Sequence, residues 1–200
     1  MSSTTQFPSL PGLNAFLRPL SVSDTKSCTT VESAFPEHER CSEEKFIYRL
    51  NQTPELCLGL FIKAKDNERL IGHVIANRTS FKTATDGSML MPESWRSLAP
   101  HDVSLCEGEI IGNDPAGGTV AIHSVAISPE YQGKGVGRAL VKAYVQYIRE
   151  ANVVADRIVL IAHGHLIGFY EAAGFHNFGP SPCQFAGGGW FDMVILLDPN

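Results

Sequence analysis

The chain has 200 residues, of which 16 are basic and 21 acidic, so its formal net charge is −5, and 44% of its residues are hydrophobic. This composition is typical of a globular domain with a full core, and its acidic balance argues against a general nucleic-acid binder, whose affinity depends on a basic surface. No apolar run approaches the roughly 20 residues that cross a bilayer, and the N-terminus does not resemble a secretory signal. We therefore expect a cytoplasmic protein that binds neither nucleic acids nor membranes.

Cysteine usage favours reduced thiols and no metal centre. The five cysteines are an odd number, lie far apart, and form no C-x-x-C pair, which argues against a disulfide framework or a structural zinc site. His163 and His165 have no cysteine or acidic residue nearby at ligand spacing, so we expect no metal there. The cysteines are Cys28, Cys41, Cys57, Cys106 and Cys183.

The first part of the chain predicts alternating strands and helices. Residues 1–14 are rich in serine, threonine and proline and are expected to form a flexible N-terminus, with a single domain over 15–200. Helix-start signals, apolar periodicity and a polar turn between two apolar runs indicate the elements that follow. These are a strand over 16–20, a helix from Ser23-Asp24 to Pro36, a helix capped by Ser42, and a hairpin of strands 56–64 and 70–76.

Residues 77–118 show neither helical nor strand periodicity. The segment contains many helix and strand breakers, including Asn113-Asp114-Pro115, and predicts a long loop. Long irregular segments in compact domains are often lids or binding loops. A variable surface insertion is an equally good interpretation.

Regular structure is predicted again from Thr119. A β-branched strand leads into a glycine-rich turn and an amphipathic helix, and two further strands surround a short helix that ends at Gly174. With both parallel and antiparallel connections, the sequence predicts an α/β fold with a mixed central sheet flanked by helices. The predicted elements are a strand over 119–128, a helix with its apolar face at 139–148, a strand over 157–162, a helix over 166–173 and a strand over 191–197.

The glycine-rich turn between the strand and the helix has the geometry of an anion site. Glycines let the backbone approach a phosphate, and free N–H groups of the first helical turn point toward it. A Walker motif is excluded because Lys134 is followed by Gly135, and a dinucleotide fingerprint is excluded because Arg138 stands where its third glycine is required. The pattern that fits is Gln/Arg-x-x-Gly-x-Gly, present at 132–137.

This loop resembles the pyrophosphate loop of the GNAT superfamily of acyl-CoA-dependent N-acetyltransferases. Two neighbours carry the resemblance further: the preceding strand TVAIHSVAIS, and Phe169-Tyr170-Glu171-Ala172-Ala173-Gly174-Phe175 one strand later. The resemblance implies a GNAT fold with splayed central strands and acetyl-CoA as co-substrate. It also implies a set of residues that bind acetyl-CoA: Val125, Ala126, Ile127, Gln132, Gly133, Lys134, Gly135, Val136, Gly137, Arg138 and His163.

The chain further resembles the serotonin (arylalkylamine) N-acetyltransferase branch, of the fungal, non-vertebrate type. The segments that carry this resemblance are 34–36 with 41–42, 54–59, 118–123 and 169–175. It implies a small arylalkylamine or polyamine acceptor, with His123 in proton removal and Tyr170 as the acid. Pro36 and Ala121 would lie at the acceptor; Ala121 replaces the first histidine of the branch's His-x-His, which leaves one titratable ring.

These roles compete with simpler interpretations. Without the resemblance, a lone histidine such as His123 in an apolar strand is more often a core residue, and Pro36 is equally well a helix stop. By alternation His123 shares a face with Ala121 and Val125. Acidic residues near the first helix favour a solvated surface, although they could also attract an ammonium group. They are Glu37, Glu39, Glu43 and Glu44.

The expected reaction is direct attack of a neutral amine on the acetyl thioester. An alkylammonium has a pKa of about 10.4 and an imidazole about 6.5, so direct proton transfer is uphill by roughly 5 kcal/mol. His123 would therefore need a desolvated amine or a path through water. A backbone N–H near Val125 would stabilise the oxyanion, and Tyr170 would hydrogen-bond the departing thiolate.

Two other functions stay open at this stage. One is peptide or protein N-acetylation, which requires an open groove beside the site. The other is a catalytically silent acetyl-CoA-binding module. The replacement of the branch's first histidine by Ala121 is compatible with such a module, whereas the presence of both His123 and Tyr170 argues against it. The sequence does not define the oligomeric state, and a monomer is compatible with it.

Overall fold

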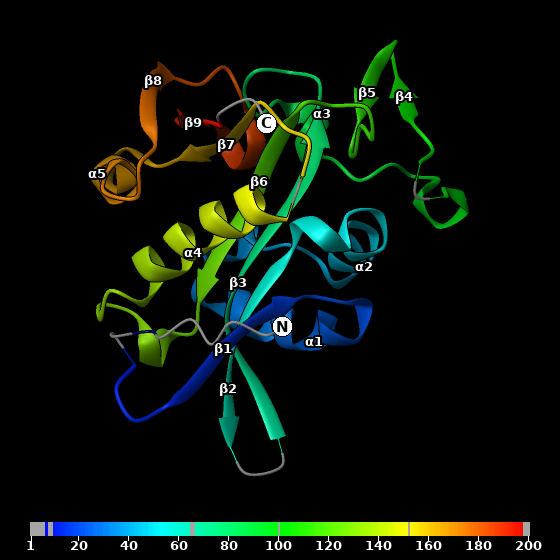
Figure 1. The fold of residues 1–200 in the computed structure, drawn as a ribbon. Coiled ribbons are helices and arrows are strands. Elements are labelled where there is room, and N and C mark those ends of the chain that lie inside the picture. Colours follow the sequence, from blue (N-terminus) through cyan, green and yellow to red (C-terminus); the bar gives the residue numbers. More distant parts are fainter. Residues whose placement is uncertain (1–6, 8–9, 65–66, 100, 152, 198–200) are drawn as a thin grey trace.

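The computed structural model describes residues 7, 10–64, 67–99, 101–151 and 153–197. Its main sheet has seven strands, and neighbouring strands are antiparallel except for the parallel pair β6–β7 (Figure 1). The predicted mixed α/β sheet is confirmed. In spatial order the strands are β1 (Asn14–Pro19), β2 (Leu58–Ala64), β3 (Asn67–Thr79), β6 (Thr119–Ile127), β7 (Arg157–Ala162), β9 (Phe191–Leu196) and β8 (His176–Pro180).

Helices cover both faces of this sheet. One face packs against α1 (Thr25–Val31) and α2 (Glu43–Gln52), and the other against α4 (Val136–Glu150) and α5 (Ile167–Glu171). As predicted, Ser42 caps α2, and its Oγ accepts a hydrogen bond of 3.2 Å from the Lys45 amide. The first helix ends at Val31, and one short 3-10 turn, Glu32–Ala34, follows it before Pro36.

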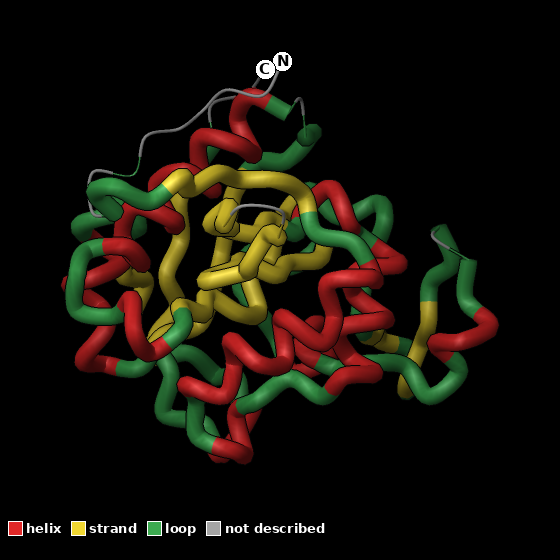
Figure 2. The backbone as a smooth tube through the Cα atoms, turned by 90° about the horizontal axis from the view of Figure 1, so that it is seen from below, coloured by secondary structure: helices red, strands yellow, loops and turns green. Residues whose placement is uncertain are grey.

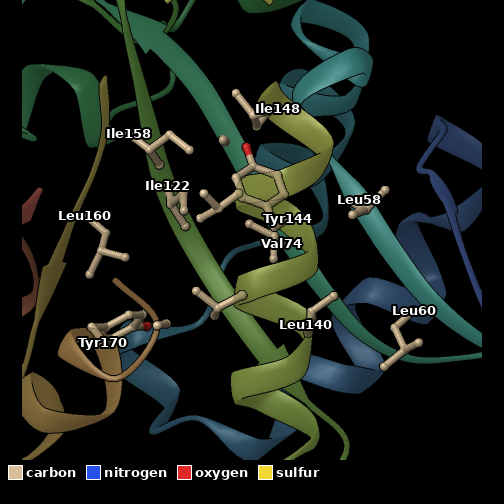
Figure 3. Packing of buried hydrophobic residues seen from close by; sticks show 14 of the residues in the cluster. Leu58, Leu60, Val74, Ile122, Leu140, Tyr144, Ile148, Ile158, Leu160 and Tyr170 are labelled. Atoms are coloured by element: carbon tan, nitrogen blue, oxygen red, sulfur yellow. The ribbon is translucent and has the colours of Figure 1, made fainter. Parts of the chain in front are cut away.

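The α4 face shows how helical periodicity builds the core. Leu140, Tyr144 and Ile148 recur at four-residue spacing, point toward the sheet and are fully buried (Figure 3). Burial of each such side chain contributes about 1.5–3 kcal/mol. The Tyr144 hydroxyl donates a hydrogen bond of 2.8 Å to the Leu56 carbonyl, so its polar end is satisfied inside the core. These contacts fix the start of α4 relative to β6.

The N-terminal prediction needs correction where residues are described. Phe7 and Leu10 were expected in the flexible N-terminus, yet both are buried in the α4-side core. The apolar contacts of these two side chains attach them to the core, although the Ser/Thr/Pro-rich composition predicted a flexible tail here. Residues 1–6 and 8–9 of the predicted tail lie outside the described residues.

The segment 77–118 is more ordered than predicted. β3 extends to Thr79, the single-turn helix α3 covers Asp86–Met89, and β4 (Ser104–Cys106) pairs with β5 (Glu109–Ile111) beside the main body (Figure 2). The buried side chain of Asn77 donates to the carbonyls of Ser88 and Gly112, at 3.1 and 2.8 Å. Because these bonds join residues far apart in sequence, local periodicity did not reveal them.

The central strands β6 and β7 separate at one end. They pair only through Thr119–Ala121, whereas β6 stays paired with β3 as far as Ile127 and β7 stays paired with β9. The open side of β6 beyond Ala121 therefore forms a gap in the sheet. This is the splay that the sequence resemblance implied.

Candidate active site

The glycine-rich turn leaves β6 and forms the N-terminus of α4. Gly133 and Gly135 have φ of +70° and +77°, a region that favours glycine, and Gly135 is the N-cap of α4. A Cβ at either glycine would meet nothing within 4 Å, so the turn presents bare backbone. Backbone N–H groups at a helix N-terminus attract anions, and this arrangement fits a diphosphate.

A cavity of about 430 Å³ lies against this turn, and we call it the glycine-loop cavity. Most of the predicted acetyl-CoA residues line it, and the polar and apolar parts of the wall suit a ligand with both characters. Its lining comprises Phe35, Val125, Ile127, Gln132, Gly133, Gly135, Gly137, Arg138, Leu166, Phe169 and Tyr170.

Three of the predicted acetyl-CoA residues point elsewhere. The Ala126 side chain is buried in the α1–α2 core, and Val136 is buried in the α4 core. The Lys134 ammonium donates a hydrogen bond of 2.7 Å to the Glu130 carbonyl. Only backbone groups of Ala126 and Val136 can face a ligand in the glycine-loop cavity.

Main-chain groups of β6 face the gap between the strands. The Ser128 amide donates to Ile71 on β3 at 2.8 Å, and N–H directions alternate along an antiparallel strand. The N–H groups of Val125 and Ile127 therefore point away from β3, toward the gap. In agreement, the Ile127 carbonyl accepts a hydrogen bond of 2.8 Å from the Gln132 side chain.

A β-bulge in β6 changes the orientation of His123. Ser124 pairs with Ile75 and Ile122 with Ala76, so His123 has no partner on β3. The alternation prediction was wrong here: Val125 packs with the α4-side core, whereas His123 contacts α3. Both residues at the bulge, His123 and Ser124, are among those that line one cavity.

This second cavity, the histidine cavity, has a volume of about 120 Å³ and shares Phe35, Val125, Leu166 and Tyr170 with the glycine-loop cavity. Aromatic, acidic and imidazole side chains surround it. Its lining comprises Phe35, Glu39, Met89, Ile122, His123, Ser124, Val125, Ile161, Ala162, His163, Leu166, Tyr170, Phe185 and Trp190.

The environment of His123 opposes protonation. Burial, followed by the nearby charges of Arg49 and Lys45, holds the pKa of His123 well below its usual value. Nδ1 lies 2.8 Å from Sδ of Met89, and Nε2 is buried with no hydrogen-bond partner among the described residues. At neutral pH the ring is therefore uncharged.

Tyr170 lies where the two cavities meet. It is buried on α5 at the edge of the core cluster (Figure 3), with the rings of Phe169 and Phe175 packed edge-on at 4.9 and 5.8 Å. Burial raises the pKa of the Tyr170 hydroxyl. The hydroxyl thus stays protonated at neutral pH and can donate a hydrogen bond.

His163 belongs to the histidine cavity rather than to the glycine-loop cavity. Its Nε2 lies 3.2 Å from a carboxylate oxygen of Glu39, and its ring packs at a tilt against Trp190 with centroids 4.1 Å apart. Glu39, one of four acids that the sequence assigned to a solvated surface, is mostly shielded from solvent. A carboxylate among aromatic rings is suited to an ammonium group.

The two predicted acceptor residues line neither cavity. Ala121 is fully buried against Ala84, Val159 and Val194. Pro36 does not line either cavity, whereas its neighbour Phe35 lines both. Ala121 therefore contacts neither proposed ligand site in this structure.

Several further residues of the histidine cavity were not predicted as site residues, and four of them have acidic, sulfur or aromatic side chains that a ligand could contact. Met89, Phe185 and Trp190 come from segments without strong periodicity, and Glu39 from an acidic stretch. The sequence signal for these residues was the presence of aromatic residues in the glycine-rich segment 185–190. Large aromatic side chains in an irregular segment usually pack against the core or a ligand.

The described residues contain neither a metal-binding cluster nor a membrane-spanning helix. Within the described ranges, no three His, Cys, Asp or Glu side chains are grouped so that they could hold a metal ion. No helix in the same ranges is long and apolar enough to cross a membrane.

Comparison with known proteins places the chain in a family. The model of the acetyltransferase (GNAT) family matches residues 25–175. Mycothiol acetyltransferase of Propionibacterium freudenreichii is 31% identical over 110 residues, which cover 46% of this chain and 33% of that protein. The chain thus matches about a third of the length of this curated relative.

Solved structures share the fold at low identity. The NatC complex bound to Gag peptide and CoA has a TM-score of 0.62 and 16% identity, covering 92% of this chain and 99% of that chain. PaiA N-acetyltransferase of Thermoplasma acidophilum, in complex with coenzyme A, has a TM-score of 0.54 and 16% identity with the same coverage. These comparisons do not support the narrower serotonin N-acetyltransferase branch. With a family model matching most of its length and the splayed sheet of that fold, the chain belongs to the acetyltransferase (GNAT) family.

Proposed function

We propose that this protein is an acetyl-CoA-dependent N-acetyltransferase that acetylates a small primary amine. The observation that carries the proposal is the junction of two cavities at Tyr170 and Val125. One cavity has bare glycine backbone at a helix N-terminus, which suits the diphosphate of acetyl-CoA. The other combines a shielded carboxylate with aromatic walls, which suits an ammonium group on an apolar body. CoA in related structures supports the first assignment.

The acceptor is proposed to be an arylalkylamine, with a polyamine as the nearest alternative. Phe35, Phe185 and Trp190 supply aromatic surface, and Glu39 supplies a negative charge beside it. An aromatic amine would use both features, whereas a polyamine would use mainly the charge. The curated relative described above is a mycothiol acetyltransferase and does not support this choice.

Transfer would proceed by direct attack, without a covalent enzyme intermediate. The neutral amine attacks the acetyl carbon, and the Val125 N–H, which faces the gap, stabilises the developing oxyanion. The Tyr170 hydroxyl donates a hydrogen bond to the sulfur and protonates it as it leaves. His123 lines the same cavity, and its low pKa favours a neutral ring that orients the amine or a water molecule.

Peptide N-acetylation is the second candidate function. The matching structures include the NatC complex, which was solved with a peptide. Against a peptide, the histidine cavity has only about 120 Å³ and Met89 of α3 closes part of it. A catalytically silent acetyl-CoA-binding module is the third candidate. Measurable acetyl transfer would distinguish either acetyltransferase from such a module.

The test measures thiol release from acetyl-CoA by purified protein with tryptamine, phenylethylamine, spermine and a short unblocked peptide. We expect the aromatic amines to give the highest kcat/KM. Preference for spermine would replace the acceptor assignment, and preference for the peptide would favour the second function. Binding of acetyl-CoA without release in any sample would contradict the proposal and identify a binding module.

A further inference from the structure

The loop over 181–190, which joins β8 to β9, supplies two aromatic residues of the histidine cavity. These residues are Phe185 and Trp190. The Ser181 amide donates a hydrogen bond of 2.8 Å to the Trp190 carbonyl, so the two ends of the loop are joined. The Trp190 indole donates a hydrogen bond of 2.7 Å to the Phe185 carbonyl. A displacement of the loop at Phe185 would therefore also disturb the indole of Trp190.

The backbone between these two aromatic residues is rich in glycine. Gly187, Gly188 and Gly189 have φ of +100°, +77° and +77°, and glycine loses more conformational freedom on ordering than any other residue. The loop sequence alone therefore does not fix the place of Phe185, and contacts with other segments must do so. Among the residues that the structure describes, the hydrogen bonds from the loop to elements other than β8 and β9 all end on Asp86.

Asp86, the first residue of α3, binds the loop directly before Phe185. Its two carboxylate oxygens accept hydrogen bonds of 2.9 and 3.1 Å from the Gln184 amide. The Cys183 thiol donates to the same carboxylate at 3.4 Å, and burial raises the pKa of this thiol to about 11, so the donor proton is present at neutral pH. Hydrogen bonds to a carboxylate are stronger than those between neutral groups. We call this set of bonds the Asp86 contact.

The helix α3 that carries Asp86 is itself attached to the body of the protein. The buried guanidinium of Arg49 donates a hydrogen bond of 3.2 Å to the Met89 carbonyl, and the side chain of Asn77 bonds the carbonyl before it. Sδ of Met89 in turn contacts the ring of His123. α3 therefore has a fixed place in the wall of the histidine cavity, and the Asp86 contact fixes the loop relative to it.

We propose that Asp86 is a positioning residue for the acceptor, which holds Phe185 and Trp190 in the cavity wall as a preformed surface for an aromatic amine. This rests on the proposed N-acetyltransferase function and names a determinant of its acceptor preference. Asp86 lines neither cavity, so it acts through the loop and not on the substrate. A binding surface that is ordered only part of the time lowers the apparent affinity by that fraction, and a preformed one avoids this loss.

A simpler role for Asp86 is local stabilisation of α3. An acidic residue in the first turn of a helix interacts favourably with the free N–H groups there. That role needs the charge, whereas the Asp86 contact needs an acceptor oxygen. Asp86→Asn removes the charge and keeps an oxygen for the Gln184 amide, whereas Asp86→Ala removes both. Asp102→Ala is the matched control, because Asp102 accepts a hydrogen bond of 2.8 Å from the Ala99 amide and lines neither cavity.

The first experiment measures kcat and KM with phenylethylamine and with spermine. In Asp86→Ala we expect KM for phenylethylamine to rise about tenfold, as for a loop that is ordered about a tenth of the time. KM for spermine should stay near the wild-type value, because a polyamine uses mainly the charge of Glu39. kcat and acetyl-CoA affinity should also stay near wild type, since Tyr170, His123 and the glycine-rich turn lie outside the loop. Asp86→Asn and Asp102→Ala should keep the wild-type preference.

Three kinetic results would overturn the proposal. The first is a wild-type KM for phenylethylamine in Asp86→Ala. The second is an equal rise of KM for both acceptors, which would mean that the substitution does not act on the aromatic wall. The third is an equal loss in Asp86→Asn and Asp86→Ala, which would assign the effect to the charge at the start of α3.

A second readout does not need turnover. By NMR, the Trp190 indole N–H should exchange with solvent about tenfold faster in Asp86→Ala than in the wild type, Asp86→Asn or Asp102→Ala. Trp95→Phe assigns the indole signals, because the chain has two tryptophans. Unchanged exchange in Asp86→Ala would contradict the proposal. Faster exchange in Asp86→Ala, combined with a wild type that acetylates no amine, would confirm the Asp86 contact and contradict the proposed function.

Discussion

The glycine-loop cavity and the histidine cavity meet at Val125 and Tyr170, yet the chain builds them in different ways. The first comes mostly from one continuous segment, 125–138, together with 166–170. The second takes residues from the turns after α1, from α3, from the two strands β6 and β7, from α5 and from the loop before β9. A ligand site made by one segment is visible in sequence, whereas a site assembled from many segments depends on the fold.

This difference suggests that the two cavities tolerate change differently. The glycine-loop cavity relies on backbone conformation, so its binding should respond to substitutions that restrict φ. The histidine cavity relies on side-chain chemistry, so its specificity should respond to loss of single charges and rings. The following predictions test this contrast.

The largest effect is expected at the junction of the cavities. Tyr170→Phe removes the hydroxyl that serves the leaving thiolate, and we expect kcat to fall by about 100-fold or more with little change in acetyl-CoA affinity. Steady-state kinetics and acetyl-CoA titration measure both quantities. Tyr147→Phe also loses a hydroxyl, one that bonds Glu55 outside both cavities, and should retain activity. Unchanged kcat in Tyr170→Phe would remove Tyr170 as the acid.

A backbone change should weaken acetyl-CoA binding alone. Gly135→Ala adds a Cβ that meets no neighbour but requires φ of +77°, which costs an L-residue about 1–2 kcal/mol, or roughly 5- to 30-fold in affinity. Isothermal titration with acetyl-CoA measures the loss. Gly179→Ala, at φ +99° on β8, is the control for strain away from the cavity. Equal affinities in the two variants would mean that the turn does not bind the diphosphate.

A side-chain change should instead alter acceptor selection. Glu39→Gln removes the carboxylate next to His163, and we expect KM for phenylethylamine to rise about tenfold, which corresponds to about 1.4 kcal/mol. Acetyl-CoA affinity should not change. Glu43→Gln alters an exposed acid at the start of α2 and serves as control. If both substitutions raised KM equally, general acidity rather than Glu39 would attract the amine.

The smallest effect is expected on stability in acid. The folded-state pKa of His123 lies below its unfolded value, so the unfolded chain binds more protons and stability falls as pH drops below about 6.5. Between pH 7.5 and 5, the melting temperature of His123→Gln should therefore fall less than that of the wild type. Parallel curves for the two proteins would show that His123 becomes protonated without penalty.

The sequence by itself determined six of the seven strands of the main sheet, α4 and the glycine-rich turn of the glycine-loop cavity, whereas the edge strand β8 was not predicted. The apolar spacing of Leu140, Tyr144 and Ile148, and the glycines at 133 and 135, are local patterns whose physical requirements act within a few residues. The same locality explains why Tyr170 was found: its neighbours form a short continuous motif. The extent of β3, by contrast, exceeded its apolar run, because pairing with β6 carries it to Thr79.

Only the tertiary structure decided the histidine cavity. Strand alternation placed His123 with Ala121 and Val125, but a bulge in the pairing with β3 interrupts the alternation, and both His123 and Ser124 line the histidine cavity. Composition assigned Glu39 to a solvated surface, yet contact with His163 from a distant strand end encloses it. The burial and charge that lower the pKa of His123 likewise come from residues on other elements. Desolvation and charge act through space, and a local sequence pattern carries no record of them.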